Sequence, residues 1–276
     1  MDFIQKWRSE KRMKAVLITG TTSGIGKAFA EKFASVGNNV ILVARNEQKL
    51  KEQQLFLQDH YNVTVKYIAY DLAKEDAVDL IANTLDEWNV YVDILINNAG
   101  FNECGLFVKT DIRKELDMIN LHIRFITQLT KSILLKMEEM GWGRILNVGS
   151  TGSFIPSPTD AVYSATKAYI MSFSNALRGE YSKTGIKITT LCPGATKTEF
   201  ATKANLSNTL LFKMAVMKPE KLVDIAYPKL MKGKRLIIPG VYNKLLVMFS
   251  MMLPISITNR ITVSMLKGHD KTKKYK

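Results

Sequence analysis

The sequence predicts a single α/β domain in which seven parallel strands form one sheet with helices on both faces. Short apolar runs alternate with longer amphipathic stretches through most of the 276 residues, which is typical of successive β-α-β units. Most of these runs lack polar alternation, as expected for strands that are buried on both faces. No Pro-rich or Ser-rich linker and no repeat of solenoid length interrupts the pattern, so we expect one domain.

The expected elements follow from these runs and from the residues between them. The gaps between strands are predicted to be helices: Gly24–Val36 places Ile25, Ala28 and Phe29 at helical spacing, and Asn46 can cap a helix that contains Leu50, Leu55 and Leu57. We expect strands at Ala15–Thr19, Asn39–Ala44, Thr64–Tyr70, Asp93–Asn97, Arg144–Val148, Lys187–Leu191 and Arg235–Ile238.

Composition excludes several classes of protein. The chain has 39 Lys and Arg against 25 Asp and Glu, a net charge of +14, and the termini carry half of this excess: +3 in residues 1–14 and +4 in residues 267–276. Because no basic stripe is interleaved with aromatic residues, we expect no nucleic-acid partner.

Cys104 and Cys192 lack metal-ligand spacing and are too few for a disulfide framework, so we expect buried or idle thiols in a reducing compartment and no metal site. No signal peptide is visible, which makes the cytoplasm the expected location.

The segment after the seventh strand has a different character, because Leu245–Ile257 is almost entirely apolar. A membrane span needs about 20 apolar residues, whereas this run is shorter and contains Pro254. Three interpretations stay open. The segment packs over a substrate pocket, forms a subunit interface, or lies on a membrane surface with help from the lysine-rich tail.

A glycine-rich turn follows the first strand and opens a helix, in the order Thr19-Gly20-Thr21-Thr22-Ser23-Gly24-Ile25-Gly26. Gly20 turns the chain, Gly24 lets the backbone approach a pyrophosphate, and Gly26 lets the helix pack closely on the sheet while its N–H groups face the anion. We therefore expect Gly20, Thr22, Ser23, Gly24, Ile25 and Gly26 to bind a dinucleotide in a Rossmann-like, doubly wound sheet.

The end of the second strand indicates which dinucleotide is bound. The strand ends in Val43-Ala44-Arg45, where an acid would bind the ribose hydroxyl of NAD and a cation accommodates the 2′-phosphate of NADP. Arg45 offers a planar, permanently charged donor for that phosphate. We predict NADP(H), with NAD(H) as the alternative.

Tyr163 and Lys167 are four residues apart in a segment predicted to be helical, so both side chains lie on one helix face. A phenol with a pKa near 10 is a poor base at neutral pH, and a nearby ammonium lowers its pKa. The fifth strand runs out at Gly149-Ser150, which places the Ser150 hydroxyl at the carboxyl edge of the sheet, where ligands bind in such folds.

Taken together, these motifs resemble the compact branch of the short-chain dehydrogenase/reductase family. The resemblance runs in order from Ala15 to Thr198, about two thirds of the chain. The matching pieces are Thr19-Gly20-x-x-x-Gly24-x-Gly26, Asp71-Leu72, Asn97-Asn98-Ala99-Gly100, Asn120, Ser150, Tyr163-x-x-x-Lys167 and Pro193-Gly194-x-x-x-Thr198. We therefore expect three parts in the chain: a basic extension (1–14), an NADP-binding catalytic domain (15–240) and an apolar segment with a basic tail (241–276).

The resemblance implies a role for each matching residue. Tyr163 is the general acid in carbonyl reduction, Lys167 lowers its pKa and holds the nicotinamide ribose, and Ser150 binds the substrate oxygen. Asn120 holds a water linked to Lys167, or marks a helix kink. Asp71 and Leu72 contact the adenine, although Asp71 could instead cap the next helix. Asn98, Ala99 and Gly100 pass beside the adenosine ribose, or form a plain turn. Thr196 and Thr198 meet the nicotinamide carboxamide.

The predicted function is an NADPH-dependent reductase of a lipophilic ketone or aldehyde. Apolar residues between Thr198 and Pro219 suggest a lid over the nicotinamide or an ordinary packed helix: Phe200, Leu206, Leu210, Leu211, Phe212, Met214 and Met217. The alternatives are an NAD-dependent alcohol or hydroxysteroid dehydrogenase and a catalytically weak nucleotide sensor. The family resemblance also implies a homodimer or homotetramer.

Overall fold

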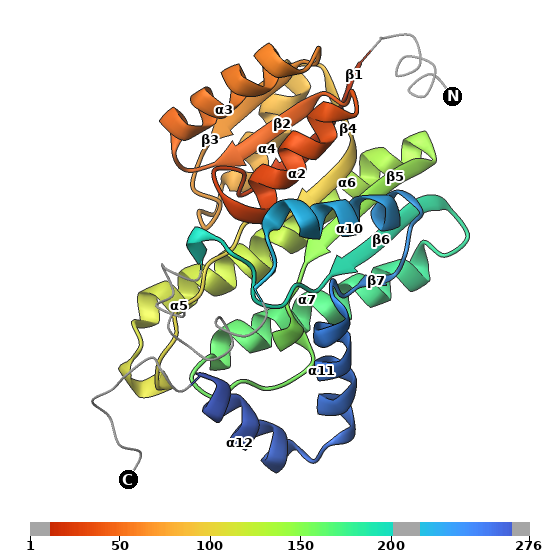
Figure 1. Ribbon diagram of the computed structural model, residues 1–276. Coiled ribbons are helices and arrows are strands. Elements are labelled where there is room, and N and C mark those ends of the chain that lie inside the picture. The colour runs from red at the N-terminus through yellow and green to blue at the C-terminus, as the bar shows by residue number, and fades with distance from the viewer. Residues whose placement is uncertain (1–11, 201–215, 267–276) are drawn as a thin grey trace.

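The computed structural model describes residues 12–200 and 216–266 and confirms the predicted sheet (Figure 1). Seven strands lie in the order β3-β2-β1-β4-β5-β6-β7, and every neighbouring pair is parallel. The strands are β1 Met13–Thr19, β2 Val40–Ala44, β3 Val65–Ala69, β4 Val90–Asn97, β5 Trp142–Val148, β6 Gly185–Leu191 and β7 Leu236–Ile237. The strand order reverses between β1 and β4, and ligands of open α/β sheets bind at the carboxyl ends of such strands.

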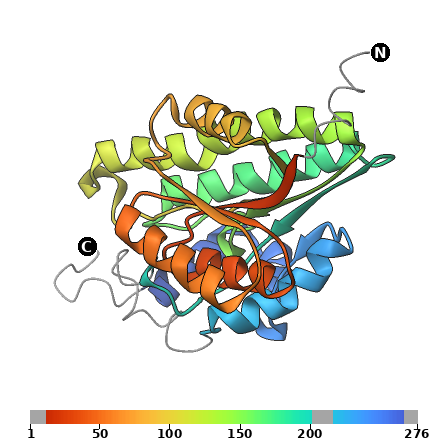
Figure 2. The same cartoon turned by 90° about the horizontal axis from the view of Figure 1, so that it is seen from above.

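Helices cover both faces of the sheet, as predicted (Figure 2). One face is covered by α2 (Gly24–Ser35), α3 (Glu47–His60) and α10 (Pro219–Met231). The other is covered by α4 (Ala77–Glu87), α6 (Ile126–Met140) and α7 (Ala161–Glu180). This three-layer arrangement leaves the two ends of the strands as the places where loops can form a site.

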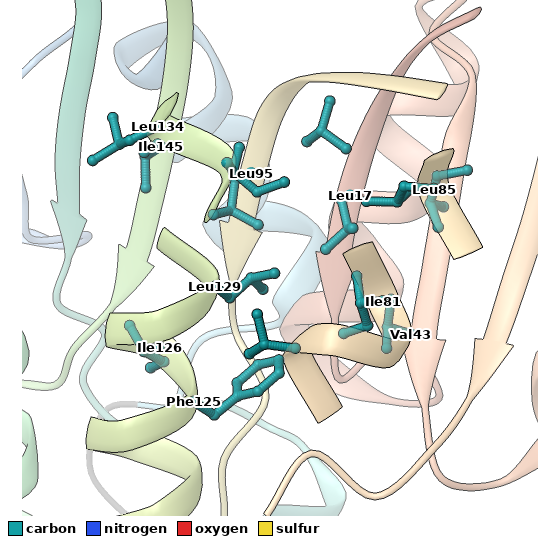
Figure 3. Close-up of a cluster of buried hydrophobic side chains, with 14 of the residues drawn as sticks. Leu17, Val43, Ile81, Leu85, Leu95, Phe125, Ile126, Leu129, Leu134 and Ile145 are labelled. Carbon is teal, nitrogen blue, oxygen red and sulfur yellow. The ribbon is translucent and has the colours of Figure 1, made fainter. Parts of the chain in front are cut away.

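Fully buried aliphatic and aromatic side chains join the sheet to the helices. Figure 3 shows Leu17 of β1 and Leu95 of β4 facing Ile81 of α4 and Leu129 of α6. Phe125, just before α6, fills the space beside them. Burying a side chain of this size contributes about 1.5–3 kcal/mol, so this layer holds the strand ends in fixed relative positions.

Local sequence signals account for several element ends. The Asn46 side-chain oxygen accepts a hydrogen bond from the Lys49 backbone N–H at 2.9 Å, which confirms the predicted cap of α3. Pro219 begins α10, where its missing N–H has no helical partner in any case. β4 begins at Val90, three residues before the predicted start, because the chain turns at Asn89 with a φ of 52° rather than at a glycine.

The apolar C-terminal segment forms two helices, α11 (Val241–Met252) and α12 (Ile255–Leu266), separated at Pro254. Val247 and Asn243 of α11 are buried against the body, where the Asn243 amide donates to the Pro239 carbonyl at 2.7 Å. Much of the remaining apolar surface of both helices is exposed. In the described part of the chain, no helix has both the length and the hydropathy to cross a bilayer.

Candidate active site

A cavity of about 970 Å³ lies along the carboxyl edge of the sheet. It extends from the glycine turn after β1, past the ends of β4, β5 and β6, to α11 and α12. Gly26 and Asn120 are the two predicted site residues that do not line it. The predicted residues that do are Gly20, Thr22, Ser23, Gly24, Ile25, Arg45, Asp71, Leu72, Asn98, Ala99, Gly100, Ser150, Tyr163, Lys167, Thr196 and Thr198.

The glycine turn leaves no room for larger residues at two positions. Gly20 has a φ of 71°, and a Cβ there would lie 2.8 Å from the Ala99 Cα. A Cβ on Gly26 would overlap the Gly20 carbonyl oxygen and lie 2.5 Å from the Asn98 side-chain nitrogen. Gly26 therefore permits close packing of α2, whereas Gly20 permits the sharp turn.

The loop after β4 is tied directly to this turn. The Asn98 amide nitrogen donates to the Thr19 carbonyl at 2.8 Å and to the Gly20 carbonyl at 3.1 Å. The Thr19 hydroxyl accepts from the Asn98 and Ala99 backbone N–H groups, each at 3.0 Å. The Asn98 side chain thus joins the loop after β4 to the glycine turn. A plain turn, the alternative given for this loop, would not need these side-chain hydrogen bonds.

Two cations, Arg45 and Lys49, lie at the outer end of the cavity near the glycine turn. Arg45 Nη1 is 3.8 Å from Asp71 Oδ2, and Lys49 Nζ is 3.3 Å from Glu199 Oε1. The alternative that Asp71 caps the next helix is wrong, because α4 begins at Ala77 and Asp71 Oδ1 accepts from the Ala73 N–H at 3.1 Å. The sequence analysis did not identify Lys49, because no motif contains it and only the position of α3 brings it to the same end of the cavity as Arg45.

Tyr163 and Lys167 lie on one face of α7, as their spacing predicts. The Lys167 ammonium is 5.6 Å from the centre of the Tyr163 ring and donates to the Val148 carbonyl at 3.0 Å. Ser150 precedes a single 3₁₀ turn, η3 (Thr151–Ser153), and its hydroxyl oxygen accepts from the Gly152 N–H at 3.0 Å. The Ser150 hydroxyl also hydrogen-bonds the Tyr163 phenol.

Burial dominates the electrostatics of this pair. It raises the pKa of Tyr163 above its usual value of 10, while the hydrogen bond with Ser150 acts in the opposite direction. Burial also lowers the pKa of Lys167 to about 8. The predicted lowering of the Tyr163 pKa is therefore not found in this structure, because desolvation of the phenol outweighs its other interactions. Burial likewise raises the pKa values of Cys104 and of Cys192, the latter to about 12, so both thiols are protonated at neutral pH.

His122 lies behind this pair and was not singled out from the sequence. It belongs to η2 (Asn120–Phe125), a wide π-helical turn between α5 (Ile112–Ile119) and α6. Its Nδ1 is 2.9 Å from the Thr166 hydroxyl, while Nε2 is buried without a hydrogen-bond partner and faces the space that a Gly100 side chain would fill. Burial and then the charge of Lys167 hold the His122 pKa well below 6.5. Asn120 starts the wide turn, in agreement with the kink interpretation.

The loop after β6 closes the cavity near the glycine turn. A Cβ on Gly24 would lie 2.7 Å from the Thr198 methyl group, so the two loops are in close contact. Met217 pairs with this loop, since its N–H donates to the Ala195 carbonyl at 3.0 Å. The Phe200 ring centre is 5.9 Å from that of Tyr163. The other predicted lid residues, apart from Met217, fall in 201–215, outside the described residues.

The far end of the cavity combines an apolar and a polar wall. Leu246, Phe249 and Leu253 of the C-terminal segment supply apolar surface. On the other wall, the Asn102 amide donates to Asp160 Oδ1 at 3.1 Å, and both residues are buried. Packing over the pocket, one of the three interpretations of Leu245–Ile257, therefore agrees with the apolar wall. The polar wall was not predicted, because no local motif pairs Asn102 with Asp160.

Comparison with known proteins gives consistent matches. The family described as short chain dehydrogenase matches residues 14–209. The very-long-chain 3-oxoacyl-CoA reductase of Rattus norvegicus is 33% identical over 189 residues, which cover 67% of this chain and 60% of that protein. A short-chain dehydrogenase from Sphingobium yanoikuyae, solved in complex with NADPH, is 32% identical with a TM-score of 0.77, over 83% of this chain and 89% of that chain. A 7beta-hydroxysteroid dehydrogenase is 27% identical with a TM-score of 0.82, over 92% and 98%.

Proposed function

The chain belongs to the short-chain dehydrogenase family, and on that premise we propose that it is an NADPH-dependent reductase of a lipophilic ketone or aldehyde. Membership makes it an oxidoreductase that uses NAD(P) and acts on alcohol and carbonyl groups. One observation carries the finer proposal. A single cavity joins the glycine turn, the Ser150–Tyr163–Lys167 group and the apolar side chains of α11.

The residues at the glycine turn fit a dinucleotide. The close approach allowed by Gly20 and Gly24 leaves backbone free to meet a pyrophosphate at the start of α2. Arg45 and Lys49 supply two cations at the outer end, where a 2′-phosphate would extend. The Asp71 carboxylate lies 3.8 Å from the Arg45 guanidinium, so a 2′-phosphate bound by Arg45 would compete with that carboxylate. When bound, the nicotinamide supplies a hydride to the carbonyl carbon of the substrate.

The residues of the chain manage the proton and the developing negative charge. Tyr163 is held protonated by its raised pKa, which suits a donor of a proton to the carbonyl oxygen. Ser150 accepts from the Gly152 N–H, so its own hydroxyl hydrogen, which bonds the Tyr163 phenol in this structure, can be donated to the same substrate oxygen. After transfer, the phenolate lies on the same helix face as the Lys167 ammonium, whose position is fixed by the Val148 carbonyl. Reduction of a carbonyl to an alcohol is thus balanced by one hydride and one proton.

The apolar end of the cavity indicates the substrate class. Leu246, Phe249 and Leu253 line it, and water-excluding walls of this kind favour a lipophilic group beside the reacting carbonyl. Asn102 and Asp160 offer a polar contact on the opposite wall. The similarity to a very-long-chain 3-oxoacyl-CoA reductase and to a 7beta-hydroxysteroid dehydrogenase supports a large apolar substrate. Short charged aldehydes that proved far better substrates than lipophilic ketones would contradict this class.

The test is the initial rate of NADPH and NADH oxidation with ketosteroids, 3-oxoacyl thioesters, aromatic ketones and aldehydes. We expect Tyr163→Phe to lower kcat by about 10²–10⁴-fold, the usual contribution of a positioned acid. Tyr169→Phe is the matched control, because Tyr169 lies on the same helix, outside the cavity lining, and bonds Thr127. Full activity of Tyr163→Phe would refute the proposed mechanism.

Cofactor choice is tested by titration of both nucleotides against Arg45→Ala and Lys49→Ala. We expect each change to weaken NADPH binding and to leave NADH binding nearly unchanged, with the exposed Arg113→Ala as the control. Equal use of NADH, with unchanged NADPH affinity in Arg45→Ala, would favour the NAD-dependent alcohol or hydroxysteroid dehydrogenase. Tight NADPH binding without turnover of any carbonyl would favour the nucleotide sensor.

We also propose a homodimer or homotetramer, the assembly implied by family resemblance. Exposed Ile112 and Leu116 on α5 and Leu135 on α6 provide apolar surface for such an interface. Light scattering after size-exclusion chromatography tests this assembly, and a monomer across the working concentration range would contradict it.

A further inference from the structure

The C-terminal helices expose a continuous run of large apolar side chains. We define the α11–α12 face by the exposed residues Val241, Leu245, Met248, Met251, Met252 and Ile255, of which Met252 is 75% exposed. Soluble monomers rarely expose large contiguous apolar patches, and those that occur mark interaction sites. The two helices α11 and α12 lie at the bottom of the molecule in Figure 1, at the end opposite α3.

This face is continuous with the mouth of the cavity. Phe249, Leu253 and Ile261 line the cavity and are also 57%, 38% and 45% exposed, respectively. Each of these side chains therefore lies both on the outer surface and on the wall of the substrate end. A lipophilic molecule held against the α11–α12 face could reach Tyr163 without first crossing water.

The charge around the face identifies the chemistry of its partner. Residues 241–266 contain Lys244 and Arg260 and no acid, and the ten residues that follow them in sequence contain five lysines and one aspartate. A second copy of the chain placed on this face would bring Lys244 and Arg260 of both copies together, and residues 241–266 contain no acid to pair with them, so their like charges would repel. A surface of anionic lipid headgroups attracts them while its acyl region accepts the apolar side chains.

We propose that the α11–α12 face docks on a lipid bilayer that contains anionic headgroups, and that the lipophilic carbonyl enters the cavity from that bilayer past Phe249 and Leu253. The docking half rests on the exposed apolar residues of this face and on the excess of basic residues in the C-terminal part of the sequence. The entry half rests on the proposed reductase function.

Docking is tested with the full chain and no substrate, by sedimentation with phosphatidylcholine vesicles that do or do not contain about 30% phosphatidylserine. We expect binding at least about tenfold tighter to the anionic vesicles, and weaker binding as salt screens the lysines. The variant Met252→Glu/Ile255→Glu should lose about tenfold or more in affinity, because it places two charges in the apolar face. Neither residue lines the cavity. Leu55→Glu is the matched control, since Leu55 is also exposed and belongs to α3, which lies at the opposite end of the molecule from α11 and α12 (Figure 1).

Either of two results would overturn docking: no binding of the native chain to anionic vesicles at low salt, or equal binding by the double-glutamate variant. Conversion of a native dimer to a monomer by the same variant, with vesicle binding unchanged, would identify the face as a subunit interface.

Entry is tested by turnover. For a lipophilic ketone dissolved in anionic vesicles, the double-glutamate variant should show a raised KM, while kcat/KM for a water-soluble aldehyde stays unchanged. An unchanged KM in a variant that no longer binds vesicles would overturn entry from the bilayer. Failure of every carbonyl with the native chain would overturn the reductase function instead, and the vesicle assay would still decide docking.

Discussion

Replacement of Lys167 by methionine should stabilise the protein in the absence of nucleotide and abolish its reductase activity. Lys167 is 5% exposed, and its burial lowers its pKa from 10.5 to about 8. At neutral pH the folded protein therefore holds a buried ammonium that the unfolded chain leaves in water. Methionine has a similar length and no charge, so it removes that unfavourable desolvation while filling the same space.

The pKa of Lys167 sets the size of the effect. A difference between 10.5 and about 8 corresponds to about 3 kcal/mol, because one pKa unit is about 1.36 kcal/mol. The variant also loses the hydrogen bond to the Val148 carbonyl, and a bond from a charged donor contributes about 1.5 kcal/mol or more. We expect a net gain of about 2 kcal/mol at pH 7, or about 4–8 °C in Tm for a chain of this size.

The pH dependence has a defined sign. Between pH 8 and 10.5 Lys167 is neutral in the folded protein and protonated in the unfolded chain, so the unfolded state binds more protons and native stability rises with pH. The advantage of Lys167→Met should shrink across that window, as measured by urea unfolding at pH 7 and 9.5. Lys131→Met, an exposed change of the same charge, should show neither effect. A Lys167→Met protein that is less stable than the native protein at pH 7, or a difference that does not change with pH, would refute the reasoning.

Three further predictions concern residues near the strand ends. Gly26→Ala should destabilise the fold by about 3 kcal/mol or more, because its Cβ overlaps the Gly20 carbonyl; Gly26→Ala melting within 1–2 °C of the native protein would contradict this packing. Acidification below pH 6.5 should destabilise His122→Leu less than the native protein, because His122 is neutral in the folded state and takes up a proton in the unfolded state. Urea unfolding at pH 5 and pH 7 tests this, with His60→Leu, a change at an exposed histidine, as the control. Asn98→Ala should cost about 1–3 kcal/mol, because two partly buried carbonyls lose their donor. An unchanged urea midpoint would be evidence against that role.

The sheet could be predicted from the sequence because its strands are buried on both faces. Every residue of β2 is buried, so the run Val40–Ala44 has no polar alternation to obscure it. Strand starts were less predictable. β4 begins after Asn89, which adopts a left-handed conformation without the glycine that usually marks such a turn.

The site could be predicted where its residues follow a strand directly. The turn after β1, Asn98 after β4 and Ser150 after β5 each lie within two residues of a strand end, so sheet topology alone brings them together. Lys49, His122 and Phe249 depend instead on how helices pack. The burial of His122, for example, requires a wide turn in its helix and a glycine at position 100. Residue spacing in the sequence predicts neither the wide turn nor the need for a glycine at position 100.

Unfavourable local features gather around Tyr163, and this clustering supports a functional origin. Thr159 is β-branched and has a φ of 72°, a conformation that costs energy, and it lies four residues before Tyr163. Lys167 holds a desolvated charge, and His122 Nε2 is a buried acceptor without a partner. The helix before α6 is widened to a π turn at the same place. A core selected for stability alone would replace each of these features, as the Lys167→Met variant does. A catalytic role at Tyr163 would account for their clustering, and each should then show the same opposition between stability and turnover.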